Sequence, residues 1–211
     1  MRHWLVLAAL IGSSAVAFGQ SFEAGISVGE STFRGDSKNL GTTGGPNDPQ
    51  FQMKDGFRIS ARMAINPYRF FGYEFEYTYN HTSLDQPATT ATGGLPGQTT
   101  STAAQNIPVP IHQVYGNFLV YATPEGTHVR PFATGGVGFS SFFPPGSSVY
   151  YGNQVTKFGF NYGGGLKVRV SGFWGIRFDV RWYNTSKPFD LPFQSGRLNM
   201  LGISGGVSIN M

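Results

Sequence analysis

Hydrophobic and polar residues alternate in eight segments of this chain. The clearest segment is 174–182, where bulky apolar residues alternate with Arg177, Asp179 and Arg181. A period of two places successive side chains on opposite faces of a β-strand. A strand with one apolar and one charged face suits a barrel wall that separates lipid from a polar interior. The pattern therefore predicts a small transmembrane β-barrel.

The connections between these segments alternate between long and short. We expect strands at about 22–29, 57–65, 71–79, 111–122, 129–139, 157–170, 174–182 and 197–211. Short turns fall at 66–69, 123–127 and 171–173, whereas long polar loops fall at about 30–54, 81–110, around 144–146 and 184–196. In outer-membrane barrels the short turns and both termini lie in the periplasm. The spacing thus predicts an all-β fold, an eight-stranded antiparallel up-and-down transmembrane β-barrel.

The first twenty residues have the features of a secretory signal. Arg2 and His3 precede an apolar run at 4–11, and small residues follow, with Ala15 and Ala17 in a small-x-small pattern. The run is far shorter than the roughly 20 residues of a spanning helix. We expect a signal peptide at 1–20, cleaved near 17–20, followed by an outer-membrane barrel domain at 21–211.

Charge and cysteine content narrow the function classes. The formal net charge is +4, but the basic residues stand singly within the strands, which argues against nucleic acid as a partner. The chain has no cysteine, so disulfides and thiol chemistry are excluded. Stability must come from strand pairing, packing and the membrane.

Charged residues gather on the face that should point into the barrel. The interior of an eight-stranded barrel is just wide enough for side chains to fill it. Because buried charges are costly unless paired, we expect a plug of ion pairs in the lumen. The alternative is a narrow ion or small-solute channel, which the basic excess favours. The predicted lumen network is Glu23, Arg58, Arg62, Glu74, Glu76, Arg177, Asp179 and Arg181, with Arg130, Lys157, Lys167 and Arg169 nearer the barrel ends.

Three segments resemble a known family. The runs at 114–121 (VYGNFLVY), 130–138 (RPFATGGVG) and 177–181 (RFDVR) are similar to bacterial outer-membrane β-barrel domains of the OmpA/OmpX type. The resemblance covers essentially the whole mature chain and implies an outer-membrane location, but it implies little about activity. The family usually ends in an aromatic residue that the barrel-insertion machinery reads, whereas this chain ends in Met211. We expect the insertion signal to be Leu201, Ile203, Val207, Ile209 and Met211.

Other functions have weaker support. A soluble lipocalin-like barrel would turn its apolar face inward around a ligand, but here that face carries too many rings. His81 and Ser83 resemble the His-x-Ser pair of a lipid A-modifying esterase, yet the only nearby acid is Asp85, and such chemistry needs a carboxylate to orient the histidine. Histidines 81, 112 and 128 are too widely spaced to indicate a metal site. We therefore expect neither an enzyme nor a cofactor.

The expected role is structural or cell-surface interaction through the long loops 30–54 and 81–110. Expected partners are outer-membrane lipid and lipopolysaccharide, the insertion machinery, and an extracellular ligand that the sequence does not identify. Aromatic residues near the strand ends suit the girdles of a membrane barrel. They are Tyr68, Phe70, Phe173 and Trp174 at one end and Tyr79, Trp182 and Tyr183 at the other.

Overall fold

The computed structural model describes residues 21–42, 50–92, 99–145, 154–191, 193 and 196–211. The expected signal peptide at 1–20 lies outside these residues. The barrel strands are β1 (Ser21–Phe33), β3 (Phe51–Asn66), β4 (Phe71–Gln86), β8 (Ile111–Tyr121), β9 (Val129–Phe142), β10 (Val155–Arg169), β11 (Trp174–Ser186) and β12 (Arg197–Asn210). The shorter elements are η1 (Gly35–Lys38), β2 (Asn39–Gly41), β5 (Thr89–Thr92), β6 (Thr99–Thr102) and β7 (Gln105–Pro108). No helix in the described part of the chain is long and apolar enough to cross a membrane.

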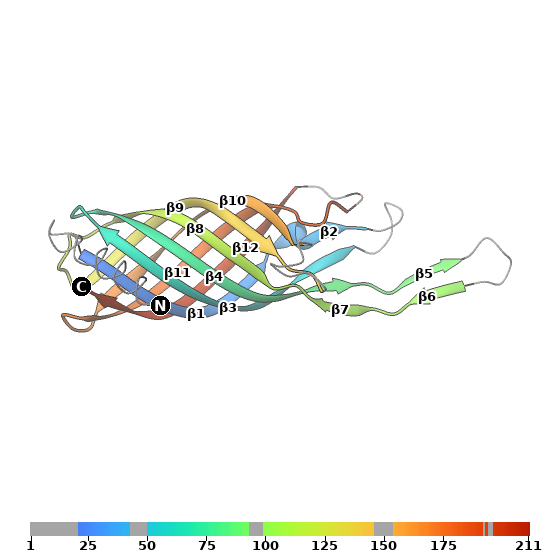
Figure 1. Cartoon of the computed structure of the whole chain (residues 1–211), viewed down its shortest axis with the longest axis horizontal. Coiled ribbons are helices and arrows are strands. Elements are labelled where there is room, and N and C mark those ends of the chain that lie inside the picture. Colours follow the sequence, from blue (N-terminus) through green and yellow to red (C-terminus); the bar gives the residue numbers. More distant parts are fainter. Residues whose placement is uncertain (1–20, 43–49, 93–98, 146–153, 192, 194–195) are drawn as a thin grey trace, which may run out of the picture.

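The eight long strands form a closed antiparallel barrel (Figure 1). Each strand pairs with its neighbours along the chain, and β1 pairs with both β3 and β12, which closes the sheet. This confirms the predicted eight-stranded up-and-down barrel. Closure satisfies the backbone hydrogen bonds of every barrel strand without leaving an open edge in lipid.

The short turns lie at one end of the barrel, together with the first and last described residues. The register pairs Ser21 with Asn66, which starts the first short turn. At the same end, the backbone N–H of Phe22 donates to the carbonyl oxygen of Met211 at 3.0 Å. We call this the turn end. The opposite end carries the long connections, and we call it the loop end.

The two faces of the barrel wall are chemically different, as the alternation predicts. Apolar side chains such as Ile26, Phe57 and Phe178 point outward and are about half exposed, whereas charged side chains such as Arg58 and Arg181 are 1% exposed. An outward apolar surface of this kind suits lipid. Tyr183 was expected in an outer girdle, but it lies inside the barrel because its parity matches that of Arg181.

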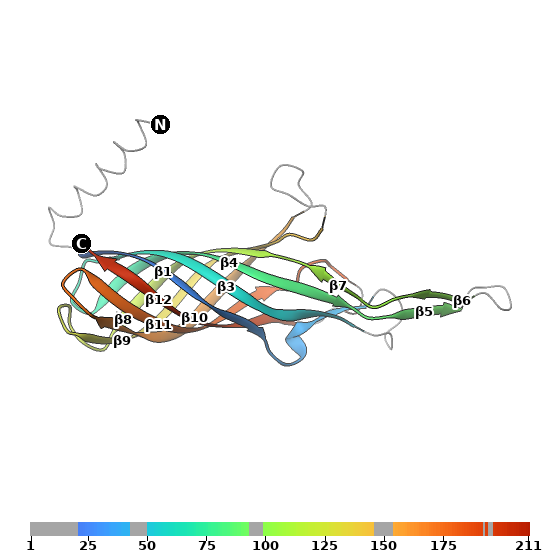
Figure 2. The same ribbon diagram turned by 90° about the horizontal axis from the view of Figure 1, so that it is seen from below.

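The loop predicted at 81–110 is wrong in part, because much of it is sheet. Strand β4 continues to Gln86, where it pairs with β3 on one side and with β7 on the other. Strands β5 and β6 then pair with each other farther from the barrel. Together these strands form an arm that projects from the loop end (Figure 2). The prediction stopped at residue 79 because the alternation continues there with small polar residues, such as Asn80 and Thr82, that are buried.

Candidate functional site: the barrel interior

A dense ion-pair network lies in the middle of the barrel, with Arg181 at its centre. Its Nη1 lies 2.7 Å from Oε2 of Glu76, and its Nη2 lies 2.8 Å from Oε1 of Glu74 and 2.9 Å from Oδ1 of Asp179. All four side chains are almost fully buried. One arginine therefore joins three carboxylates on β4 and β11 across the lumen.

Three further arginines extend this network, which then holds four arginines against three carboxylates. Arg177 Nη1 lies 2.6 Å from Glu74 Oε2, and Arg177 Nε lies 2.8 Å from Asp179 Oδ2. Arg62 pairs with Glu76 at 3.2 Å and with Asp179 at 3.4 Å, while Arg58 pairs with Glu76 at 3.4 Å. Each carboxylate therefore faces at least two arginines, which offsets the cost of burying it.

Neutral side chains add hydrogen bonds to the network, although the buried Nε atoms of Arg58 and Arg62 have no hydrogen-bond partner among the described atoms. The Tyr183 hydroxyl donates to Glu76 Oε1 at 3.1 Å and accepts from Arg58 Nη2 at 2.7 Å. Asn117 Nδ2 donates to Glu74 Oε1 at 3.1 Å. A side chain on Gly202 would collide with the Arg58 guanidinium, so glycine is required for this packing. Tyr183 and Asn117 thus link the ion pairs to strands β11 and β8 through hydrogen bonds.

Of the eight predicted lumen residues, the structure brings seven into this network and places Glu23 apart. Glu23 Oε2 pairs with Lys167 Nζ at 2.5 Å nearer the turn end, where Lys167 also donates to the Tyr121 hydroxyl at 2.8 Å. Of the residues expected near the ends, Lys157 pairs with the exposed Asp190 at 3.3 Å. The sequence reading missed Tyr121 and Tyr183 as lumen residues, although their parity within the strands could have identified them.

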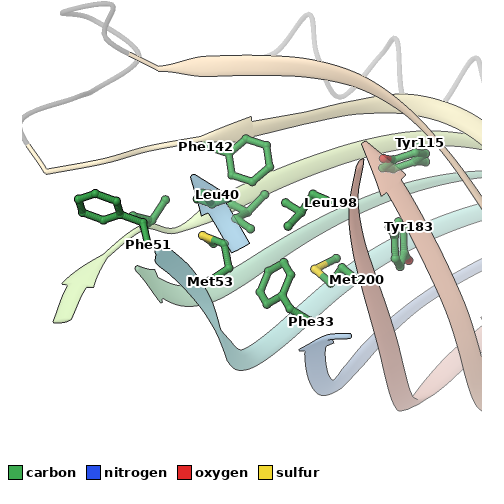
Figure 3. Packing of buried hydrophobic residues seen from close by; sticks show 11 residues of the cluster. Phe33, Leu40, Phe51, Met53, Tyr115, Phe142, Tyr183, Leu198 and Met200 are labelled. Atoms are coloured by element: carbon green, nitrogen blue, oxygen red, sulfur yellow. The ribbon is translucent and has the colours of Figure 1, made fainter. Parts of the chain in front are cut away.

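Buried apolar side chains pack together at the loop end (Figure 3). Leu40 and Val109 are fully buried there although they lie outside the eight barrel strands. Phe189 and Leu191, from the connection after β11, pack against the same group. We call the buried set the mouth cluster: Phe33, Leu40, Phe51, Met53, Val109, Ile111, Tyr115, Phe142, Tyr183, Leu198 and Met200.

An irregularity in β3 lets that strand contribute to both regions. The pairing of β3 with β4 shifts register between Lys54 and Phe57. On the turn-end side of the shift, odd-numbered residues such as Phe57 point outward. On its loop-end side, Met53 points inward and is 2% exposed. A bulge adds one residue to a strand and so exchanges its faces. Outward-facing Lys54 then pairs with Asp85 at 3.3 Å on an exposed surface.

Two small cavities lie in the described interior. One of about 10 Å³ lies between Glu23, Arg62 and Arg177. Another of about 10 Å³ lies in the mouth cluster beside Ile111 and Tyr183. Each has space for about one water molecule.

Residues considered for other roles lie on the outer face. His81 is exposed, and its Nδ1 lies 3.5 Å from the Tyr79 hydroxyl, whereas Asp85 is engaged by Lys54. His112 Nδ1 lies 2.7 Å from the Tyr77 hydroxyl. In the expected insertion signal, Ile203, Val207 and Met211 are exposed on the outer surface, and Ile209 is partly exposed. Leu201 faces the same way, opposite Trp182, but it is only 8% exposed.

Comparison with solved structures shows the same fold at low sequence identity. The chain is similar to Neisserial surface protein A, with a TM-score of 0.54, 10% identity, and coverage of 90% of this chain and 96% of that chain. It is also similar to the outer membrane protein OprG from Pseudomonas aeruginosa, with a TM-score of 0.57, 10% identity, and coverage of 91% and 95%. No curated protein sequence matches the chain.

A family model gives the classification. The model described as "Outer membrane protein beta-barrel domain" matches residues 5–209, which is nearly the whole chain. The closed barrel, its apolar outer surface and its charged interior agree with that match. The chain therefore belongs to the outer membrane protein β-barrel domain family.

Proposed function

We propose that this protein is a closed outer-membrane barrel that presents its strand arm and long connections at the cell surface for interaction. The observation that carries the proposal is the two-part filling of the lumen. Ion pairs around Arg181 occupy the middle, and the mouth cluster covers the loop end. A barrel filled in this way serves as an anchor and leaves the surface parts to act.

The arm supplies a surface for interaction. On β7, Gln105 and Asn106 are exposed, and among the described residues β7 pairs with β4 alone, which leaves its other edge open there. An open strand edge can pair with an extended segment of another chain. The arm therefore offers both polar side chains and backbone groups to a partner.

The proposed orientation follows the rule for outer-membrane barrels, with short turns and termini in the periplasm and long loops outside. Residues 1–20 would direct secretion and then be removed. The outward apolar residues Ile203, Val207, Ile209 and Met211, with Leu201, would be read by the insertion machinery. The outer surface would then contact membrane lipid and lipopolysaccharide.

Planar-bilayer recording of the purified barrel tests closure. We expect no stable unitary conductance from the wild type. An Arg181→Ala variant, which removes the centre of the network, serves as the comparison. A steady wild-type conductance that changes in Arg177→Ala would overturn the closed lumen and favour a channel.

Labelling of intact cells tests the orientation. Because the chain lacks cysteine, single substitutions give clean reporters. Gln105→Cys on the arm should react with a membrane-impermeant maleimide, whereas His128→Cys at the turn end should react only after the outer membrane is permeabilised. The reverse pattern would contradict the proposed orientation.

Deletion of residues 87–104 tests the surface role. The variant should keep the heat-dependent gel mobility of a folded barrel but reduce attachment of cells to surfaces or to one another. Unchanged attachment with normal surface expression would exclude the arm as the interacting part.

A narrow channel is the second candidate, and the excess of buried cations favours it. The described barrel strands bury six basic side chains, namely Arg58, Arg62, Arg130, Lys167, Arg177 and Arg181, against four carboxylates, Glu23, Glu74, Glu76 and Asp179. Such a lumen would favour anions over cations. The bilayer recording above decides between the two candidates.

A further inference from the structure

Three basic side chains form a row on the inner face of the barrel near the turn end, one on each of three neighbouring strands. The register places Lys167 on β10 directly opposite Arg130 on β9 and directly opposite Arg177 on β11. All three side chains point inward and are at most 8% exposed. Like charges placed directly opposite each other destabilise a sheet unless other groups compensate them.

Two of the three cations have carboxylate partners. Arg177 pairs with Glu74 and Asp179, and Lys167 pairs with Glu23. Arg130 forms no ion pair with any residue that the structure describes, and its guanidinium stacks 3.7 Å from the centroid of the Tyr121 ring. The positive charge of Arg130 is therefore the uncompensated member of the row.

The hydrogen-bonding capacity of Arg130 is also largely unused. Its Nη2 donates to the carbonyl oxygen of Arg69 at 3.3 Å, whereas its buried Nε has no hydrogen-bond partner among the described atoms. An arginine has five N–H donors and no acceptor, so only an acceptor, and best an anion, can satisfy the others.

A cavity lies beside these cations. It has a volume of about 30 Å³, and Arg130, Lys167 and Arg169 line it together with Ser208 and Asn210. Among the described residues of its wall, Glu23 is the one acid, and it is already paired with Lys167. The volume exceeds the roughly 10–15 Å³ that one water molecule needs. The cavity thus combines space for a small ion with an excess of positive charge and polar donors.

We propose that the turn end of the barrel holds a monovalent anion of about the size of chloride, bound between Arg130, Lys167 and Arg169. The anion would neutralise the end of the cation row and accept hydrogen bonds from Arg130. The site is independent of whether the lumen conducts, because it lies on the turn-end side of the ion-pair network.

Chlorine NMR on the purified, folded barrel in detergent tests the site, with chloride itself as the probe. Wild-type protein should broaden the chloride signal, and bromide should compete. Arg130→Gln should weaken apparent chloride binding by about tenfold or more, since it removes a buried charged partner. Arg130→Lys keeps the charge and should retain part of the binding. Arg197→Gln, an exposed residue at the loop end, should bind as the wild type does.

Heat-dependent gel mobility confirms that each variant is folded. Crystals soaked in bromide should then show an anomalous peak beside Arg130. Equal chloride broadening in wild type and folded Arg130→Gln, or a bromide peak elsewhere with none in this cavity, would overturn the proposal. If Arg130→Gln does not fold, the wild-type bromide peak and the Arg130→Lys titration decide the question.

Discussion

The middle of the barrel and its loop end use the same inward face of the same strands in opposite ways. In the middle, inward positions carry Arg62, Glu76 and Arg181, and the outward positions are apolar. At the loop end, inward positions carry Met53, Phe142 and Leu198, and outward Lys54 pairs with Asp85 in an exposed position. The barrel is thus a membrane barrel in its middle and resembles a water-soluble barrel at its loop end.

This difference shows that the solvent outside the wall decides the polarity inside it. Lipid around the middle requires apolar residues outside, so the polar residues of an alternating strand must point inward. Where water replaces lipid, the apolar residues can turn inward and be buried. Strand β3 makes the exchange with a bulge, and β12 makes it by changing its inward residues from Ser204 and Gly202 to Met200 and Leu198.

The largest expected effect on stability comes from removing Arg181 from the ion-pair network in the middle of the barrel. Arg181→Ala leaves Glu74, Glu76 and Asp179 with less compensation in a buried site and should lower the free energy of unfolding by about 3–5 kcal/mol. Urea unfolding in lipid vesicles measures this change. The matched control is Arg197→Ala at an exposed position, which should stay within about 0.5 kcal/mol of the wild type. Equal stability of the two variants would show that the network contributes little.

A charge on the outer surface of the middle region should have the next largest effect. Phe178→Arg places a charge in lipid and should cost about 2–4 kcal/mol if the residue lies near the midplane. Phe178→Leu keeps the surface apolar and serves as the control. The same vesicle unfolding assay applies, and wild-type stability of Phe178→Arg would mean that the faces are assigned wrongly.

Truncation in the mouth cluster should be milder. Leu198→Ala should cost about 2–3 kcal/mol, the lower part of the range for such changes, because the connections over the cluster can move inward. Leu198→Met conserves volume and should cost less than about 1.5 kcal/mol. A loss as large as that of Arg181→Ala would indicate that the loop end is as constrained as the middle.

The smallest effect concerns Lys187, which follows β11 at the loop end and donates to the carbonyl oxygen of Asn39. Burial lowers the pKa of Lys187, and Asp36 partly opposes this shift. A lysine with a lowered pKa binds fewer protons in the folded state, so stability rises with pH between the lowered pKa and the ordinary value of about 10.4. Lys187→Met should remove this small rise from the pH dependence of unfolding. An identical pH dependence in both proteins would contradict it.

The sequence was sufficient to predict the barrel and to predict which residues of its middle part face outward and which face inward. Strict alternation, as at Trp174, Phe178 and Val180, reports lipid on one side directly. The inward-facing apolar residues of the loop end were not predicted, because Phe51 and Met53 lie out of phase with Phe57. A bulge cannot be recognised by counting positions. The ion pairs within the lumen could not be predicted either, because the parity of Arg181 places it inside but does not say which carboxylates it contacts.

The exchange of faces in β3 can be tested directly with spin labels at two outward positions, Phe57 and Lys54, which lie on either side of the register shift. Accessibility is compared between oxygen, which concentrates in lipid, and a water-soluble nickel complex. We predict that the label at 57 is reached mainly by oxygen and the label at 54 mainly by nickel. Two labels that both prefer oxygen would contradict the claim that the loop end stands in water.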